Sequence, residues 1–217
     1  MGLIGRVLRS FVFRGTDLFL LSFRPRLLPA YLAIWRAEWS DSPYVRARSA
    51  ATQRRVAEAE TDPDDLTYGE TPLVTALWVL RKLGVGRGRA FVDLGAGRGR
   101  VVLAARWLGA DAAGVELAEE HVRAVKPSLE RAGARLSVGD ATKVGWTQPT
   151  DVYVNWTAFA PATRARVLDR LVELPLGSMV ACPTFPIERA ELALVFTVRA
   201  PLTWGFERIR AYRRVAG

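Results

Sequence analysis

Cysteine and histidine are almost absent from this 217-residue sequence, which contains only Cys182 and His121. A single cysteine rules out an internal disulfide framework and a cysteine-rich zinc site. With one histidine besides, the sequence argues against an enzyme built around a metal ion, and no metal site is predicted. Nothing in the sequence requires an oxidising compartment, so a cytoplasmic location is the expectation.

Long uncharged runs are also missing, because no window of 18 or more residues is free of charged side chains. A transmembrane helix is therefore not expected. The hydrophobic content of 50% and the charged content of 24% are those of an ordinary globular chain. The length suits one domain, or one domain with a small addition.

Lysine is scarce as well. Only Lys82, Lys126 and Lys143 occur, so arginine supplies nearly all of the positive charge behind the net charge of +9. Such a charge can indicate nucleic-acid binding. The arginines are nevertheless scattered instead of forming a block, as on an ordinary solvated surface, and we do not expect a nucleic-acid partner.

The sequence divides near residue 60. Residues 1–23 and 27–39 are apolar with interspersed arginines, a pattern that indicates helices, and a polar helical pattern and an acidic turn follow them. Two interpretations of residues 1–60 stay open. One is a helical cap packed on the main domain, and the other is a peripheral membrane helix with Arg6, Arg9 and Arg14 facing lipid headgroups.

From Pro72 onward, helical and strand patterns alternate. Helices are predicted over residues 71–84, 100–109, 118–133 and 161–174, and strands over 90–95, 112–117, 135–140, 151–156, 178–185, 192–198 and 206–214. This alternation predicts an α/β fold, a doubly wound and mainly parallel seven-stranded sheet with helices on both faces, closed by the last two strands. Residues 61–217 are predicted to form this domain, behind the N-terminal helical extension.

A glycine-rich loop follows the first predicted strand. In VDLGAGRGR, Asp93 ends the strand, and Gly95, Gly97 and Gly99 alternate before the next helix. Ligands of doubly wound sheets bind at the carboxyl ends of the strands, where glycine permits close approach to the backbone. The dinucleotide fingerprint G-x-G-x-x-G would place a glycine at Arg100, and no G-K-S or G-K-T run occurs. Neither a nicotinamide dinucleotide nor a nucleoside triphosphate fits.

The loop resembles that of the seven-strand class of S-adenosylmethionine-dependent methyltransferases. The resemblance implies S-adenosyl-L-methionine as the cofactor, with Asp93, Gly95 and Gly97 against its methionine part. It also implies that Glu116, which ends the second strand, binds the ribose hydroxyls. A carboxylate suits that role because it can accept hydrogen bonds from both hydroxyls.

A third acid, Asp140, follows the third strand, where the resemblance implies contact with the adenine. Ala141 stands next to it at the cofactor site, in the place of the family's aromatic ring. Three acids at three successive strand ends favour this cofactor over a nicotinamide one.

A narrower resemblance covers roughly residues 61–185. The runs Y-G-E-T, V-D-L-G-x-G-x-G and V-N-x-x-A-F are similar to those of the non-SET lysine methyltransferases of the disruptor-of-telomeric-silencing type, and of their small mitochondrial and bacterial relatives. The resemblance implies that Tyr68, Glu70 and Thr71 form a lid over the cofactor. It places Asn155 beside the methyl-transfer channel, with Tyr68 and Asn155 as the catalytic residues.

The expected function is therefore transfer of a methyl group to a lysine side chain of a protein. Methylation of a small molecule stays open, as does a cofactor-binding scaffold without turnover, because Trp156 replaces the family's second asparagine and could block the channel. Tyr153 and Phe159 are expected near the channel. His121 is expected to be a surface residue of its helix.

Overall fold

A computed structural model gives the fold and describes residues 3–40 and 70–216, except 147, 149 and 158. Tyr68 lies outside the described residues. So do the polar helical pattern and the acidic turn predicted between residues 42 and 65.

Seven strands of the described part of the chain form one sheet, in the order β3-β2-β1-β4-β5-β7-β6. Their bounds are β1 Ala90–Leu94, β2 Asp111–Glu116, β3 Arg135–Val138, β4 Thr150–Val154, β5 Met179–Pro183, β6 Leu192–Leu202 and β7 Gly205–Arg214. Strands β1 to β5 pair in parallel, whereas β7 runs antiparallel to both β5 and β6. The sheet is thus mixed, with the antiparallel pair at one edge.

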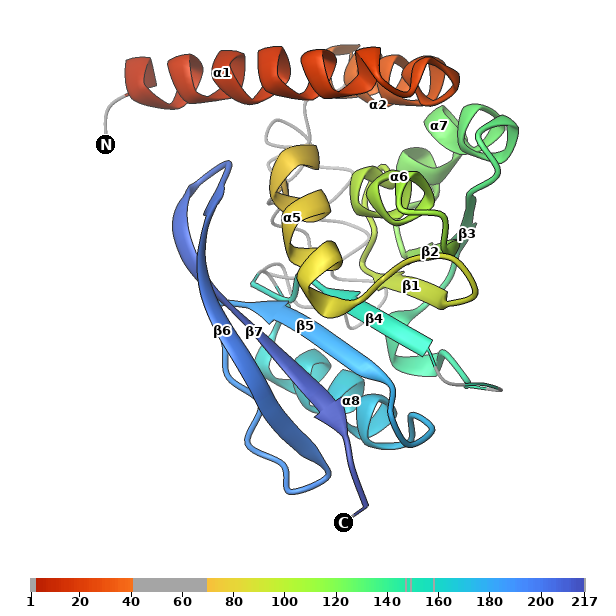
Figure 1. Cartoon of the computed structure of the whole chain (residues 1–217), viewed down its shortest axis with the longest axis vertical. Helices are drawn as coiled ribbons and strands as arrows, with labels where there is room; N and C mark the ends of the chain where they lie inside the picture. The colour runs from red at the N-terminus through yellow and green to blue at the C-terminus, as the bar shows by residue number, and fades with distance from the viewer. Residues whose placement is uncertain (1–2, 41–69, 147, 149, 158, 217) are drawn as a thin grey trace, which may run out of the picture.

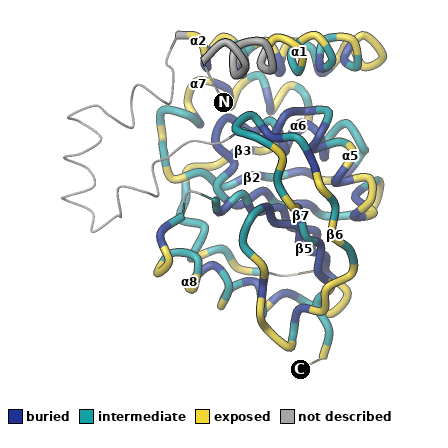
Figure 2. The backbone as a smooth tube through the Cα atoms, turned by 90° about the vertical axis from the view of Figure 1, so that its left-hand side faces the viewer, coloured by how far each residue is buried: buried dark blue, intermediate teal, exposed yellow. Residues whose placement is uncertain are grey.

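The central strands are buried on both faces, which explains why most of their residues are apolar. Every residue of β4 and β5 is buried. The edge strand β6 instead alternates between exposed and partly buried residues over much of its length. Figure 2 shows this contrast between the centre of the sheet and its β6 edge.

Helices cover both faces of the sheet, as predicted. On one face lie α5 (Leu73–Leu83), α6 (Arg100–Trp107) and α7 (Glu119–Arg131), and α8 (Pro161–Val172) lies on the other (Figure 1). Helix α5 begins after Pro72 and ends at Gly84, which adopts a left-handed φ of 88°. Helix α7 continues through Pro127 to Arg131.

The N-terminal segment forms an additional layer of two helices. Helix α1 (Leu3–Ser22) and helix α2 (Leu28–Ser40), joined by the short 3-10 helix η1 (Pro25–Leu27), lie over α5, α6 and α7 (Figure 1). Leu21, Tyr31 and Ile34 are fully buried and belong to the same apolar cluster as residues of α5 and α6. These helices therefore share the core of the sheet domain.

The membrane-helix interpretation required Arg14 to face outward, but its side chain points toward α2. Its Nη1 lies 3.1 Å from Oε2 of Glu38 on α2, and its guanidinium stacks over the ring of Trp35. The side chains of Arg6 and Arg9 lie outside the described structure.

Asp17 joins α1 to the start of α5. The side chain is buried, Oδ1 accepts a hydrogen bond of 3.1 Å from the backbone N–H of Val74, and Oδ2 accepts one of 2.9 Å from the hydroxyl of Tyr31. The first turn of a helix has N–H groups without intrahelical partners. Asp17 satisfies one of them from a distant part of the sequence, and thereby fixes where the segment before α5 lies.

Asp17→Ala should lower the free energy of unfolding by about 1–3 kcal/mol, because it leaves the Val74 N–H and the Tyr31 hydroxyl buried without their acceptor. Asp17→Asn keeps one carbonyl acceptor and should cost less. Urea unfolding of both variants, with Tyr31→Phe as the control, measures the difference. A midpoint for Asp17→Ala equal to that of the unaltered chain would contradict this role.

Candidate functional site

A cavity of about 370 Å³ lies at the carboxyl ends of β1, β2 and β4. Nine residues predicted from the sequence to form the site line this cavity: Glu70, Thr71, Asp93, Gly95, Gly97, Glu116, Asp140, Ala141 and Asn155. They come from five separate stretches of the sequence, and the sheet topology brings them together. The tenth, Tyr68, lies outside the described residues.

The loop after β1 needs glycine for conformational reasons. Gly95, Gly97 and Gly99 have φ values of 73°, 55° and 79°, in the left-handed region that other residues rarely adopt. The backbone N–H groups of Gly95 and Ala96 donate to the carbonyl of Val115 at 2.9 and 3.0 Å. A Cβ at Gly95 would also lie 2.8 Å from Cζ of Phe159. The loop is thus fixed against the end of β2.

Glu116 connects the two loops that follow β1 and β2. Its Oε2 accepts from the backbone N–H of Gly97 at 2.7 Å, and its Oε1 accepts from that of Ala118 at 2.9 Å. A carboxylate has about four acceptor positions, so each oxygen can accept a further hydrogen bond. The two backbone donors therefore hold the carboxylate in place while it lines the cavity.

Asp93 lies at the end of β1 and is 2% exposed. Burial, and then the nearby charge of Glu116, raise its pKa well above the ordinary value. The neighbouring strand β4 pairs Tyr153 with Asp93 in register, and the Tyr153 hydroxyl shares a hydrogen bond of 2.9 Å with Oγ1 of Thr71. Burial raises the pKa of Tyr153 too, so it lines the cavity as a neutral group.

Asp140 directly precedes the short 3-10 helix η3 (Ala141–Lys143) and caps it. Oδ1 accepts from the backbone N–H of Thr142 at 2.8 Å and from its hydroxyl at 2.7 Å. Burial opposes ionisation, but these hydrogen bonds and the Lys143 ammonium lower the pKa of Asp140 below its ordinary value. It therefore presents a negative charge to the cavity, next to Ala141.

A chain of buried charges leads from the N-terminal helices to the cavity. The Arg100 guanidinium binds Glu70 through Nη1, at 2.7 Å from Oε2, and binds Glu38 through Nη2. Glu38 in turn binds Arg14, so the chain runs from α1 through α2 and α6 to the segment before α5. Arg100 and Glu70 both line the cavity. The N-terminal layer thus holds two cavity residues in position.

Glu38 and Glu70, the two acids in this row of charged side chains, differ in proton affinity. Burial raises the pKa of Glu38 to about 7, and the charge of Glu70 adds to the effect against the opposing pull of Arg100. Burial would also raise the pKa of Glu70, but Arg100 and the hydrogen bond from Glu38 outweigh it and lower that pKa. Glu70 is therefore the ionised partner of Arg100.

Asn155 begins a second polar chain, at the ends of β4 and β5. Its Oδ1 accepts from the hydroxyl of Thr157 at 3.0 Å, and the Thr157 hydroxyl lies 3.2 Å from that of Thr184. Thr184 has a φ of 65°, the one positive value outside glycine among the described residues. Such a conformation is strained for a β-branched residue. Backbone hydrogen bonds to Arg208 and from the Arg210 side chain hold Thr184 in place.

Several cavity residues depart from the sequence expectations. His121 is not on the surface but lines the cavity, with Nδ1 3.9 Å from Oε1 of Glu116. It lies in the first turn of α7, soon after β2, and this nearness to the carboxyl end of a strand could have placed it at the cavity from the sequence alone. Phe159 and Tyr153 line the cavity as expected, and Trp204, from the turn between β6 and β7, also does so without any local signal.

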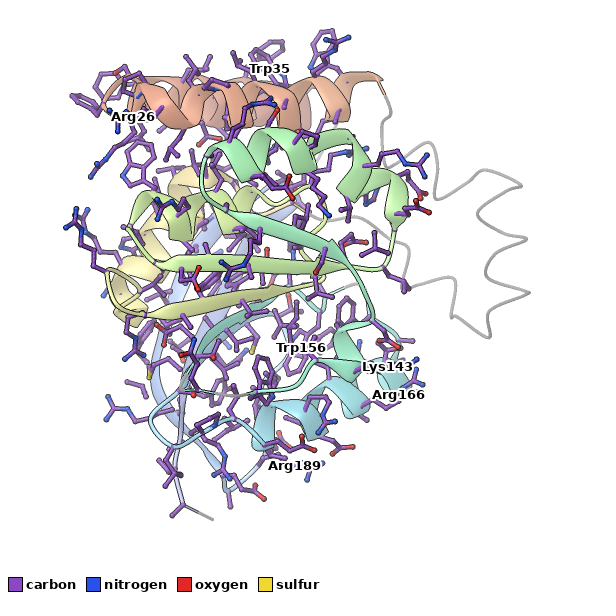
Figure 3. The ribbon with its side chains drawn as sticks, turned by 90° about the vertical axis from the view of Figure 1, so that its right-hand side faces the viewer. Arg26, Trp35, Lys143, Trp156, Arg166 and Arg189 are labelled. Carbon is purple, nitrogen blue, oxygen red and sulfur yellow. The ribbon has the colours of Figure 1, made fainter. Side chains whose placement is uncertain are left out.

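Trp156 does not line the cavity. It is 2% exposed and packs into a second apolar cluster with Leu94, Val167 and Leu171, on the side of the sheet that α8 covers (Figure 3). Asn155 lines the cavity whereas its neighbour Trp156 lies in this cluster, so the two side chains diverge. The tryptophan therefore does not block the cavity.

No protein-family model matches the sequence, and a comparison with curated proteins finds no match. Solved structures do match. TrmN from Thermus thermophilus aligns with a TM-score of 0.58 and 17% identity, over 70% of this chain and 52% of TrmN. This chain therefore spans about half the length of TrmN.

Two further structures contain the cofactor or its product. Magnesium protoporphyrin IX methyltransferase from Synechocystis, with bound S-adenosylmethionine, aligns with a TM-score of 0.56 and 13% identity, over 66% of this chain and 78% of its own. An RNA methyltransferase from Salinibacter ruber, in complex with S-adenosyl-L-homocysteine, aligns with a TM-score of 0.51 and 22% identity, over 68% of this chain and 95% of its own.

The chain has the fold of S-adenosylmethionine-dependent methyltransferases. At these identities the likeness concerns the fold, and it does not separate lysine, RNA and small-molecule substrates. The expectation that nucleic acid is not a partner gains no support from it, since RNA methyltransferases share the fold.

The charge chain predicts a pH-dependent contribution of Glu38 to stability. The pKa of Glu38 is about 7 in the folded chain, against an ordinary value of 4.5. Between pH 4.5 and 7 the folded chain therefore holds a proton on Glu38 that the unfolded chain has released. The stability that Glu38 contributes is fully present below pH 4.5 and is lost as the pH rises toward 7.

Urea unfolding of the unaltered chain and of Glu38→Gln, each at several pH values from about 5 to about 8, measures this effect. The difference in unfolding free energy between them should shift in favour of Glu38→Gln as the pH rises. A difference that shifts toward the unaltered chain would show that Glu38 is held ionised by its arginines.

Proposed function

We propose that this chain is a methyltransferase that uses S-adenosyl-L-methionine. One observation carries the proposal. Asp93, Glu116 and Asp140, each at the end of a different parallel strand, line one cavity beside a left-handed glycine loop, within the fold of these enzymes. Glu116 and Asp140 also have structural roles, in loop bracing and helix capping, but those roles do not require all three acids to face the same cavity.

The lining residues fit a cofactor with a sugar, a base and a zwitterionic amino acid. Glu116 has acceptor positions left for two ribose hydroxyls, and the ionised Asp140 can accept from an adenine amino group. At the other end, Glu70 is an acceptor for an ammonium group and Arg100 a donor for a carboxylate. Gly95 and Gly97 leave the backbone open to close approach.

The acceptor of the methyl group is, in our proposal, the side-chain amine of a protein lysine. The runs Y-G-E-T and V-N-x-x-A-F support it, together with the position of Asn155 on the cavity wall. The Asn155 amide can accept a hydrogen bond from an amine and donate one as well. Tyr153 and Phe159 add aromatic surface to the same wall.

When bound, the cofactor supplies an electrophilic methyl group on a sulfonium. The contribution of the protein is to align the amine for in-line attack, so that the new N–C bond forms as the S–C bond breaks. The amine must first lose a proton, and an apolar wall favours the neutral amine because burial disfavours its charged form. The Asn155 carbonyl, already fixed by Thr157, can orient the nitrogen.

Methylation of a small molecule remains the alternative, and the same cavity would serve it. The hypothesis of a scaffold without turnover rested on Trp156 blocking the channel. It loses that support because Trp156 lies in the core on the α8 side. The nature of the labelled product separates these functions.

Calorimetry with S-adenosylhomocysteine tests the cofactor site. Glu116→Ala should weaken binding by roughly 10-fold or more, which corresponds to the loss of about 1.4 kcal/mol from hydrogen bonds to a charged acceptor. Asp169→Ala, which removes an exposed acid from α8, is the matched control and should bind normally. Equal affinities for the two variants would remove Glu116 from the site.

Incubation with a methyl-labelled cofactor and a lysate tests the acceptor. Label is expected in protease-sensitive, nuclease-resistant material that yields methyl-lysine on hydrolysis. Asn155→Ala should reduce transfer by roughly 100-fold while S-adenosylhomocysteine affinity changes only a few-fold, because positioning acts on the transfer step. Label that appears only in RNA or only in small molecules would overturn the lysine assignment.

A further inference from the structure

The side of α1 that faces away from the body of the protein is apolar and aromatic. Phe11, Val12 and Phe19 of α1 are 65%, 59% and 66% exposed, and Phe23, which directly follows the helix, is 67% exposed; we call these four residues the α1 outer face. With 3.6 residues per helical turn, Val12 and Phe19 lie on the side of α1 opposite the buried Leu21. A row of exposed aromatic residues on one helix side indicates a surface that binds something.

The charges around this face have one sign. Residues 1–40 contain six arginines and only two acids, Asp17 and Glu38. Both acids are buried and bonded toward the interior, Asp17 to Val74 and Tyr31, and Glu38 to Arg100. The described exposed side chains of α1, η1 and α2 therefore include arginines and no carboxylate.

The aromatic and basic residues meet where α1 ends. The rings of Phe19 and Phe23 pack edge to face at 5.4 Å, and the exposed Arg24 and Arg26 follow directly. Figure 3 shows Arg26 at this end of the helical layer. Arginine can bury its methylene stem along apolar surface while its guanidinium binds phosphate.

We propose that the α1 outer face docks on the surface of an anionic lipid bilayer. The phenylalanines would enter the boundary between headgroups and acyl chains, and Arg24 and Arg26 would bind lipid phosphates. An interfacial helix of this kind combines an apolar face with basic residues and lies in the plane of the membrane. In the described part of the chain, no helix is both long and apolar enough to cross a bilayer.

Charge complementarity favours lipid over a second copy of the chain. A two-fold contact would bring the α1 outer face against itself, and so place the arginines of one copy close to those of the other without an acid between them. A nucleic acid would satisfy the arginines but would leave Val12 and the row of phenylalanines largely without apolar partners. An anionic bilayer offers partners to both kinds of side chain.

Vesicle flotation with the full chain tests this proposal. The unaltered chain should float with phosphatidylcholine vesicles that contain phosphatidylglycerol, much less with phosphatidylcholine alone, and less as salt increases. The double substitution Phe19→Ser with Phe23→Ser should reduce the bound fraction by roughly 10-fold or more, since it removes two large apolar side chains from the interface. Arg24→Gln with Arg26→Gln should lose the preference for anionic lipid.

Matched controls come from the β6–β7 hairpin. Leu194 and Phe206 are each 58% exposed, and Arg208 and Arg213 are exposed on β7, so substitutions to Ser and to Gln there remove two exposed apolar side chains and two positive charges in the same way. These control variants should float like the unaltered chain. Urea unfolding and S-adenosylhomocysteine binding should be unchanged in all variants, which separates failure of docking from failure of the cofactor site.

Three results would overturn the proposal. The first is absence of flotation with both vesicle types, and the second is equal flotation of the Phe19 and Phe23 double variant. The third is that the chain does not bind vesicles but forms a dimer or binds nucleic acid, and that the α1 substitutions abolish this dimer or this binding.

Discussion

The carboxylate of Glu116 is the contact on which the candidate site depends. It joins the N–H of Gly97, in the loop after β1, to that of Ala118, at the start of α7. The two loops meet because parallel strands place their carboxyl ends at one edge of the sheet. Left-handed glycines let the first loop turn sharply enough for its N–H to reach the acid. Cofactor recognition in our proposal uses the acceptor positions that these two bonds leave.

The N-terminal helices are part of the same arrangement. Their inner side carries Asp17, which caps α5, and Glu38, which binds Arg100. Both acids act on the segment around Glu70 and Thr71, so the position of that cavity wall depends on the α1–α2 layer. The outer side of the layer carries the aromatic face that we assign to a membrane surface. One layer thus contacts the site on its inner side and presents a binding surface on its outer side.

The sequence was sufficient for the fold from Pro72 onward, because there local patterns and the topology agree. Proline and glycine mark the ends of α5, and the central strands are buried on both faces and consist mostly of apolar residues. The acids at strand ends could be placed together before the structure, since the geometry of a parallel sheet dictates where they lie.

Contacts between distant segments could not be predicted in this way. The pairing of Arg100 with Glu38 spans 62 residues, and Arg14 points inward to the same Glu38 from a third segment. His121 and Trp156 show a second limit, because one step along a helix or an extended segment decides whether a side chain faces the cavity. Trp204 reaches the cavity only because β6 and β7 form a long hairpin.

The most direct test of the central claim is a crystal structure of the chain grown with S-adenosylhomocysteine. The account predicts the ligand in the cavity at the ends of β1, β2 and β4, with its ribose hydroxyls on Glu116 and its adenine beside Asp140. A ligand bound elsewhere, or a ribose that does not contact Glu116, would contradict it.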